Sequence, residues 1–136
     1  MAFLGTRKLD DAPILIATYG GYISAHDLDD AGQAGIPIYE QLHEDAVLII
    51  DVTQGESSFA EIFRILQHGI PAQNLTDFPY RVDVMVVGTD AMAKLYVDAA
   101  RLKQFGGQQM PMFATLDSAI SAARQRIAAR KTEKAS

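Results

Sequence analysis

The stretch that decides the fold is Val47-Leu48-Ile49-Ile50-Asp51-Val52-Thr53-Gln54-Gly55-Glu56-Ser57-Ser58-Phe59-Ala60-Glu61-Ile62-Phe63. Residues 47–52 are mainly aliphatic, which suits a strand covered on both faces, as in a parallel sheet. A short polar turn follows, and Ser58 with Glu61 three residues later forms a capping-box pattern that starts an apolar helix. Hydroxyls and backbone N–H groups therefore gather at the carboxyl end of a central strand, where open α/β sheets usually place their sites.

The size and composition of the chain indicate one domain of ordinary globular type. Its 136 residues, 49% of them hydrophobic and 21% charged, suffice for a single core in a domain that covers residues 1–136. No apolar run approaches the ~20 residues of a membrane span, and the amino-terminal residues lack the long apolar core of a signal peptide. Without cysteine the chain forms no disulfides. A cytoplasmic protein of bacterial type is the simplest interpretation, although the absence of cysteine also fits an oxidising compartment. The net charge of −5 argues against nonspecific nucleic-acid binding.

Outside the opening stretch, four further segments have the composition of strands. A strand pair, Phe3–Leu9 and Ile14–Tyr19, precedes it, and Arg81–Val87 and Met112–Ala114 follow it. Helical segments separate the later strands, and such crossover connections need parallel neighbours and right-handed turns. The sequence therefore predicts a single α/β domain, with a mostly parallel sheet of about five strands and helices packed on it.

Two early helices are marked by their start and stop signals. Ser24 caps a helix that begins at Ala25, and Pro37 should interrupt this helix. The second helix, Phe59–His68, should end at Gly69, because a glycine commonly occupies the C-cap. Residues 70–79, with two prolines, are expected to form a connecting loop.

Two later helices carry apolar residues at helical spacing. Thr89 or Asp90 caps the first of them, and its apolar stripe has five members: Met92, Leu95, Tyr96, Ala99 and Leu102. The last helix carries Ile120, Ala123 and Ile127 on one side. Its cations indicate a solvated face that also suits the negative end of the helix dipole: Arg124, Arg126, Arg130 and Lys131. Residues 131–136 are expected to form a frayed, disordered tail.

Three segments together resemble a known family. Val47–Thr53 with Ser57-Ser58 behind it is similar to a strand and helix start that present an Asp-Ser-Ser motif, and Val82–Gly88 and Met112–Ile120 are similar to a closing strand–helix–strand–helix. The family is the STAS domain (sulfate transporter and anti-sigma-factor antagonist), in its SpoIIAA-like, Sec14-like branch. The resemblance extends over residues 10–130 and implies the same α/β fold.

This resemblance also implies a non-enzymatic regulatory or protein-interaction module. In antagonist members of the family, a partner kinase phosphorylates the serine at this helix start, and phosphorylation controls partner binding. The matching positions are Ser57 and Ser58. The chain departs from the family pattern at Glu56, where the family has Asp, at Phe59, where it has Gly, and in a shorter turn. A SpoIIAA-like protein without the switch is therefore the alternative, in which Ser58 acts only as a helix N-cap worth ~1 kcal/mol.

The helix Phe59–His68 is apolar on more than one side, which indicates a protein partner, a homodimer through this helix, or a pocket beneath it. The candidate partner or ligand surface has five members: Phe59, Ile62, Phe63, Ile65 and Leu66. Four of these residues should share one face, with Ile65 apart. The alternative function is a carrier of a small apolar, lipid-like ligand. It would need a Sec14-like cavity of at least ~300 Å³ under Phe59, Phe63, Tyr96 and Phe105.

Polar residues at two strand ends are candidate neighbours of the serine loop: Asp51, Thr53, Gly88 and Thr89. Asp51 with Thr89 also matches part of a response-regulator phosphorylation site. The acidic pair and the lysine that such a site requires have no counterparts at the matching strand ends. Aspartyl phosphorylation is therefore poorly supported.

Two other groups of residues lie outside the opening stretch. Tyr19 and Tyr22 flank Gly20-Gly21 after a strand, and they are candidates for a pocket mouth. The acidic segment 27–45 lacks the ligand spacing of a metal cage and is interpreted as a solvated face. The chain has no glycine-rich nucleotide loop and no nucleophile elbow, so we assign no catalytic residue, metal site or cofactor.

Overall fold

The computed structural model describes residues 2–68, 80–105, 107 and 109–135. Its sheet has five strands in sequential order: β1 (Phe3–Lys8), β2 (Ile14–Tyr22), β3 (Ala46–Glu56), β4 (Val82–Val87) and β5 (Met112–Phe113). β1 pairs antiparallel with β2, and every later pairing is parallel. The predicted α/β fold with a mostly parallel sheet is thus confirmed.

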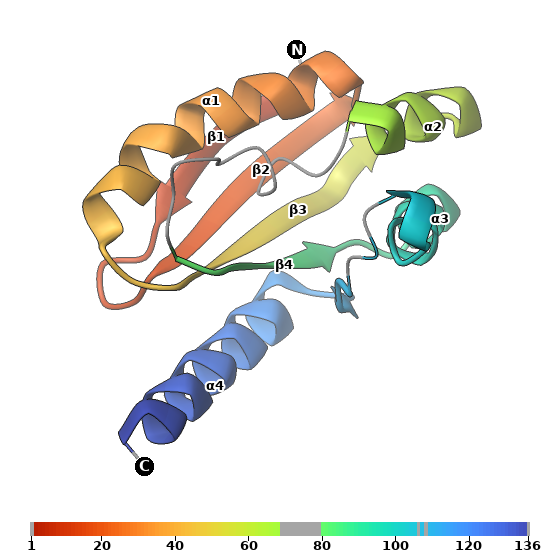
Figure 1. The fold of residues 1–136 in the computed structure, drawn as a ribbon. Helices are drawn as coiled ribbons and strands as arrows, with labels where there is room; N and C mark the ends of the chain where they lie inside the picture. Colours follow the sequence, from red (N-terminus) through yellow and green to blue (C-terminus); the bar gives the residue numbers. More distant parts are fainter. Residues whose placement is uncertain (1, 69–79, 106, 108, 136) are drawn as a thin grey trace.

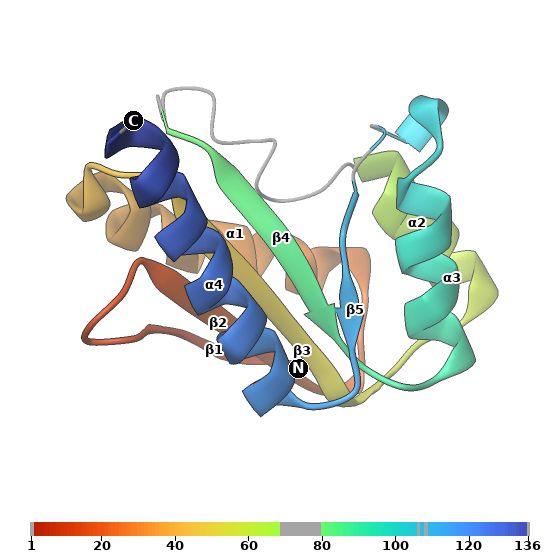
Figure 2. The same ribbon diagram turned by 90° about the horizontal axis from the view of Figure 1, so that it is seen from below.

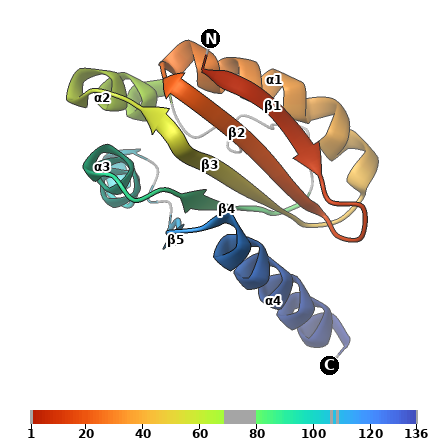
Figure 3. The same cartoon turned by 180° about the vertical axis from the view of Figure 1, so that it is seen from behind.

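Helices cover both faces of this sheet. The described residues form four α-helices: α1 (Ala25–Leu42), α2 (Phe59–His68), α3 (Ala91–Ala100) and α4 (Leu116–Ala135). A short 3₁₀ turn at Lys103–Phe105 follows α3. Helices α1, α2 and α3 lie on one side of the sheet, whereas α4 crosses the other side (Figures 1 and 2). Viewed from behind, the antiparallel edge strand β1 lies in front and α4 runs below the sheet (Figure 3).

Alternating side chains of the strands supply two separate core layers. In β3, Leu48 and Ile50 face the layer formed with α1, α2 and α3, and Val47 and Ile49 face α4. This arrangement explains the continuous aliphatic run, because a strand covered on both faces needs apolar side chains at every position. On α4, Ala119, Ala123 and Ile127 form the buried stripe, close to the predicted one. Nothing in the described part of the chain forms a helix that is long and apolar enough to span a bilayer.

Helix α1 differs from the local prediction made for it. It runs without a break from Ala25 to Leu42 and contains Pro37, which was expected to interrupt it. Pro37 is exposed, so its ring lies on the solvent side of the helix and does not disturb the packing against the sheet. The missing proline N–H removes one helical hydrogen bond, and the buried face with Leu28, Ala31 and Tyr39 outweighs that loss.

Strand β3 is longer than predicted. Residues 53–56 continue the strand, where a polar turn was expected. Gly20 and Gly21 of β2 pair with Gln54 and Gly55 after a shift of register. Pairing with β2 thus satisfies the backbone of this polar segment. The connection from β3 to α2 shortens to two residues, Ser57 and Ser58.

Helix α3 is capped by Asp90, whose carboxylate accepts the Ala93 amide at 2.7 Å. Its predicted stripe is confirmed in part, because Tyr96 is buried and Met92, Leu95 and Ala99 pack partly against the core. Four residues are fully buried: Ala93, Tyr96, Val97 and Ala100. Leu102, predicted to belong to the stripe, is exposed. The long side chains of Met92 and Leu95 lie at the edge of the buried face, where they pack partly against the core.

The last helix is longer and less solvated than the sequence predicts. Helix α4 extends to Ala135, beyond Lys131 where a frayed tail was expected. Its cations do not form a wholly solvated face, because Arg126 and Arg130 reach Asp83 and Arg124 reaches Asp11. The predicted cap at Gly69 and the predicted loop 70–79 lie outside the described residues.

Candidate functional site

The candidate site is the junction between β3 and α2, at the carboxyl end of the central strand. The Ser58 hydroxyl accepts the Glu61 amide at 3.2 Å and lies 2.8 Å from the Tyr22 hydroxyl. The Ser57 hydroxyl donates to the Ile23 carbonyl at 3.1 Å. The two serines are therefore not equivalent. Ser58 starts a helix beside an exposed tyrosine, whereas Ser57 ties the junction to the segment that precedes α1.

Glu61 has a different role from the one that the capping-box pattern predicts. Its amide donates to Ser58 as expected, but its carboxylate accepts the Ala25 amide at 2.8 Å. The second carboxylate oxygen pairs with Arg64 at 2.9 Å. Glu61 thus caps the start of α1, and it is one of the few buried charged side chains among the described residues. Burial with these partners is the way that a protein interior accommodates a carboxylate.

This contact fixes which face of α2 turns inward. Ile62, Ile65 and Leu66 are buried together with Glu61, so they are not available to a protein partner. The prediction that Ile65 lies apart from the others is wrong, because the buried arc is rotated towards Glu61. Phe59 and Phe63, one helical turn apart, are 68% and 46% exposed. The Phe63 and Phe105 rings form a T-shaped contact at a centroid distance of 6.1 Å.

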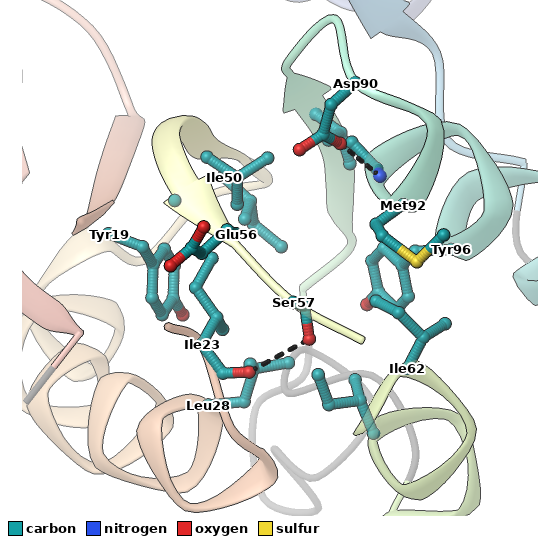
Figure 4. A pocket seen from close by; sticks show the side chains of 15 residues that line it. Tyr19, Ile23, Leu28, Ile50, Glu56, Ser57, Ile62, Asp90, Met92 and Tyr96 are labelled. Carbon is teal, nitrogen blue, oxygen red and sulfur yellow. Dashed lines mark hydrogen bonds between the residues drawn. The ribbon is translucent and has the colours of Figure 1, made fainter. Parts of the chain in front are cut away.

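Beneath α2 and α3 lies an apolar pocket against the carboxyl ends of β2, β3 and β4 (Figure 4). Its cavity volume is about 50 Å³, smaller than the ~300 Å³ that the lipid-carrier hypothesis requires. Its lining includes two tyrosines, Tyr19 and Tyr96, and two isoleucines of α2, Ile62 and Ile65. Of the aromatic residues expected above a cavity, only Tyr96 belongs to this lining. The prediction that Tyr19 and Tyr22 stand at a pocket mouth is wrong, because the buried Tyr19 lines the pocket interior and Tyr22 lies outside the lining, in contact with Ser58.

The four candidate neighbours of the serine loop do not share one position. The Asp51 carboxylate accepts the amide and the hydroxyl of Thr53, and strand alternation turns both side chains to the α4 side of the sheet. Thr89 is exposed. Gly88 is buried near the pocket, where an added Cβ would lie 3.0 Å from Val52 and 3.1 Å from Ala93. A glycine at residue 88 therefore allows α3 to start close to β3.

The contacts of two polar side chains were not predicted from the sequence, although Ser24 and Asp27 have the spacing of a capping box. Tyr22 contacts Ser58 only because β2 and β3 continue side by side beyond the predicted strand ends. Asp27, assigned to a solvated acidic face, is buried and accepts both the amide and the hydroxyl of Ser24 at 2.8 Å. Within the described ranges, no group of three or more His, Cys, Asp or Glu side chains is placed to hold a metal ion.

Comparison with known proteins gives a consistent result for the architecture. No protein-family model and no curated protein matches the sequence. Among solved structures, the chain is similar to an uncharacterised protein of the DUF3478 family with a SpoIIAA-like fold from Shewanella loihica, with a TM-score of 0.57 and 16% identity. It is also similar to an anti-sigma factor antagonist from Mycobacterium paratuberculosis, with a TM-score of 0.53 and 18% identity. Each match covers 90% of this chain and 92% of the other. The chain therefore has the SpoIIAA-like fold that the resemblance to STAS domains implied.

Proposed function

We propose that this protein is a STAS-like regulatory module that binds a protein partner through α2, under the control of serine phosphorylation at the β3–α2 junction. The observation that carries the proposal is the exposure of Phe59 and Phe63 on α2, directly after Ser57 and Ser58. Two neighbouring exposed aromatic side chains are an unusual use of surface unless a partner covers them. The fold shared with an anti-sigma factor antagonist supports a partner-binding role.

Ser58 is the better phosphate acceptor of the two serines. Its hydroxyl lies at the amino-terminal end of α2, where backbone N–H groups and the helix dipole favour a phosphate. A phosphoryl group there would displace Tyr22 from its 2.8 Å contact. It would also add negative charge near Glu56 and Glu61, which re-aims the start of α2 beside the exposed aromatic residues. Ser57 would first have to break its hydrogen bond to Ile23.

The test combines mass spectrometry with site-specific crosslinking in the protein's own cells. The intact mass of the purified protein should show one added phosphoryl group. Mass spectrometry of its peptides should place that group on Ser58. A photo-crosslinking p-benzoylphenylalanine in place of Phe63 should then capture one defined protein. The same group in place of Leu4, which is 62% exposed on β1, is the matched control and should capture nothing.

The phosphorylation step is tested by changing Ser58 in the crosslinking strain. Ser58→Glu should reduce the adduct at residue 63, and Ser58→Ala should leave it at the level of the unphosphorylated protein. Absence of an adduct at residue 63 would overturn the partner proposal. An adduct with the mass of two copies of this chain would mean that α2 forms a homodimer and does not bind a different protein. A partner adduct that neither Ser58 substitution changes would leave a constitutive interaction module.

A further inference from the structure

Two buried tyrosines, Tyr19 and Tyr96, line the pocket beneath α2 and α3. Tyr96 is 7% exposed, and its hydroxyl has no hydrogen-bond partner among the described residues. Figure 4 shows this side chain on α3 with the hydroxyl directed into the pocket. An unsatisfied buried hydroxyl destabilises a protein, so its persistence in an otherwise apolar cavity needs an explanation.

Three further polar side chains around the pocket are already engaged or lie at its mouth. Ser57 donates to Ile23, and Asp90 caps α3 (Figure 4). Glu56 and Asp90 are exposed and bring two carboxylates to the entrance. The interior is formed by aliphatic and aromatic side chains, and the Tyr96 hydroxyl is a buried donor there, without a partner among the described residues, that can direct a hydrogen bond to a guest.

We propose that this pocket binds a small, uncharged and mainly apolar molecule that carries one hydrogen-bond acceptor for the Tyr96 hydroxyl. The apolar lining favours an apolar body, and the two carboxylates at the mouth disfavour an anion. Burial raises the pKa of Tyr96, so its hydroxyl stays protonated and able to donate. The cavity volume of about 50 Å³ selects a compact guest whose far end reaches the mouth, in place of a lipid chain. This ligand site is independent of the phosphorylation and the partner proposed above.

The test uses acetophenone as the probe, because it joins an aromatic ring to one carbonyl acceptor. Ethylbenzene has the same shape without the acceptor, and benzoate adds a negative charge. Titration of each compound into the isotope-labelled full chain is followed by amide chemical shifts. Acetophenone should bind saturably, with shifts concentrated at the junction and at the start of α3, and benzoate should bind more weakly.

Tyr96→Phe separates the hydrogen bond from the pocket. It should weaken acetophenone binding about 2- to 12-fold, the value of one hydrogen bond, and leave ethylbenzene binding unchanged. Because it removes an unsatisfied hydroxyl, it should also raise the Tm of the ligand-free protein. Tyr39→Phe is the matched control, since Tyr39 is buried under α1 outside this pocket and should not affect binding.

Filling the pocket provides a second, independent variant. Ala93→Leu places a larger side chain in the lining and should abolish acetophenone binding in a protein whose amide spectrum remains folded. The proposal is overturned if acetophenone does not saturate, or if Tyr96→Phe leaves its affinity unchanged. A lower Tm for ligand-free Tyr96→Phe would likewise overturn it, because the hydroxyl would then already be satisfied within the protein.

Discussion

Asp27 joins three parts of the chain through a single carboxylate. One oxygen accepts the amide and hydroxyl of Ser24 at the start of α1, and the other accepts the amides of Ala2 and Phe3 at 3.2 and 3.4 Å. Hydrogen bonds to a charged acceptor are stronger than neutral ones. The start of β1 is therefore held to α1 by a residue that the sequence alone assigns to a solvated face.

Asp27→Asn should lower the free energy of unfolding by about 1–3 kcal/mol at neutral pH, because an amide nitrogen replaces one acceptor oxygen. Burial raises the pKa of Asp27, but the hydrogen bonds from Ser24, Phe3 and Ala2 outweigh it, so the net pKa lies below its ordinary value. A lowered pKa stabilises the folded state above the unfolded-state pKa, and this stabilisation is lost as the pH falls through the folded-state pKa.

Urea unfolding at pH values from about 7 down to about 2 measures this effect. The difference between wild type and Asp27→Asn should narrow at the acidic end. Asp29→Asn, which changes an exposed carboxylate of the same helix turn, should leave the free energy of unfolding nearly unchanged at every pH. A gap between wild type and Asp27→Asn that stays constant with pH would contradict the proposed role of the charge.

Among the helices, α1 shows how tertiary packing overrides a local signal. Pro37 lies within its continuous span, where it removes one i to i−4 hydrogen bond. Pro37→Ala restores the N–H donor for the Gln33 carbonyl and should raise the free energy of unfolding by about 1–3 kcal/mol. Urea unfolding checks the gain. The control Ala34→Gly, at another exposed position of the helix, should lower stability by about 1 kcal/mol. No gain from Pro37→Ala would mean that the proline shapes α1 in a way that alanine cannot.

The elements that the sequence predicts well are those whose signal is their own burial. The aliphatic runs of β3 and β4, and the helix after Ser58, need no information from elsewhere in the chain. Contacts distant in sequence decide the rest. Glu61 turns inward to cap Ala25, 36 residues away, and this contact rotates α2 so that Phe59 and Phe63 are exposed. The polar end of β3 is a strand only because β2 extends beside it. For this reason the site could be located from the sequence, whereas its exposed and buried residues could not be told apart.

In the molecule as a whole, the two faces of the sheet are covered by different means. Three helices share one face, and α4 alone among the described helices covers the other (Figure 2). Three small or aliphatic residues provide its buried stripe, so its apolar contact is narrow. A charged cluster adds a second attachment. Asp83 of β4 pairs with Arg126 and Arg130 of α4, and both Asp83 and Arg130 have side chains that are nearly buried, 12% and 13% exposed.

This cluster predicts a strong energetic coupling between α4 and the sheet. Asp83→Ala should lower the free energy of unfolding by about 3 kcal/mol, because the largely buried Arg130 would lose the carboxylate of Asp83. Arg130→Met removes the buried charge and keeps much of the apolar stem, so the double variant should be more stable than Asp83→Ala alone. A double-mutant cycle in urea measures the coupling between residues 83 and 130, which should reach at least about 1 kcal/mol. The exposed pair Arg124–Asp11 provides the comparison, with a much smaller coupling that weakens as salt is added. If the effects of the two substitutions on the free energy of unfolding are additive, residues 83 and 130 are not coupled. The narrow apolar stripe alone would then hold α4 in place, and substitutions of Ala123 would be expected to detach the helix.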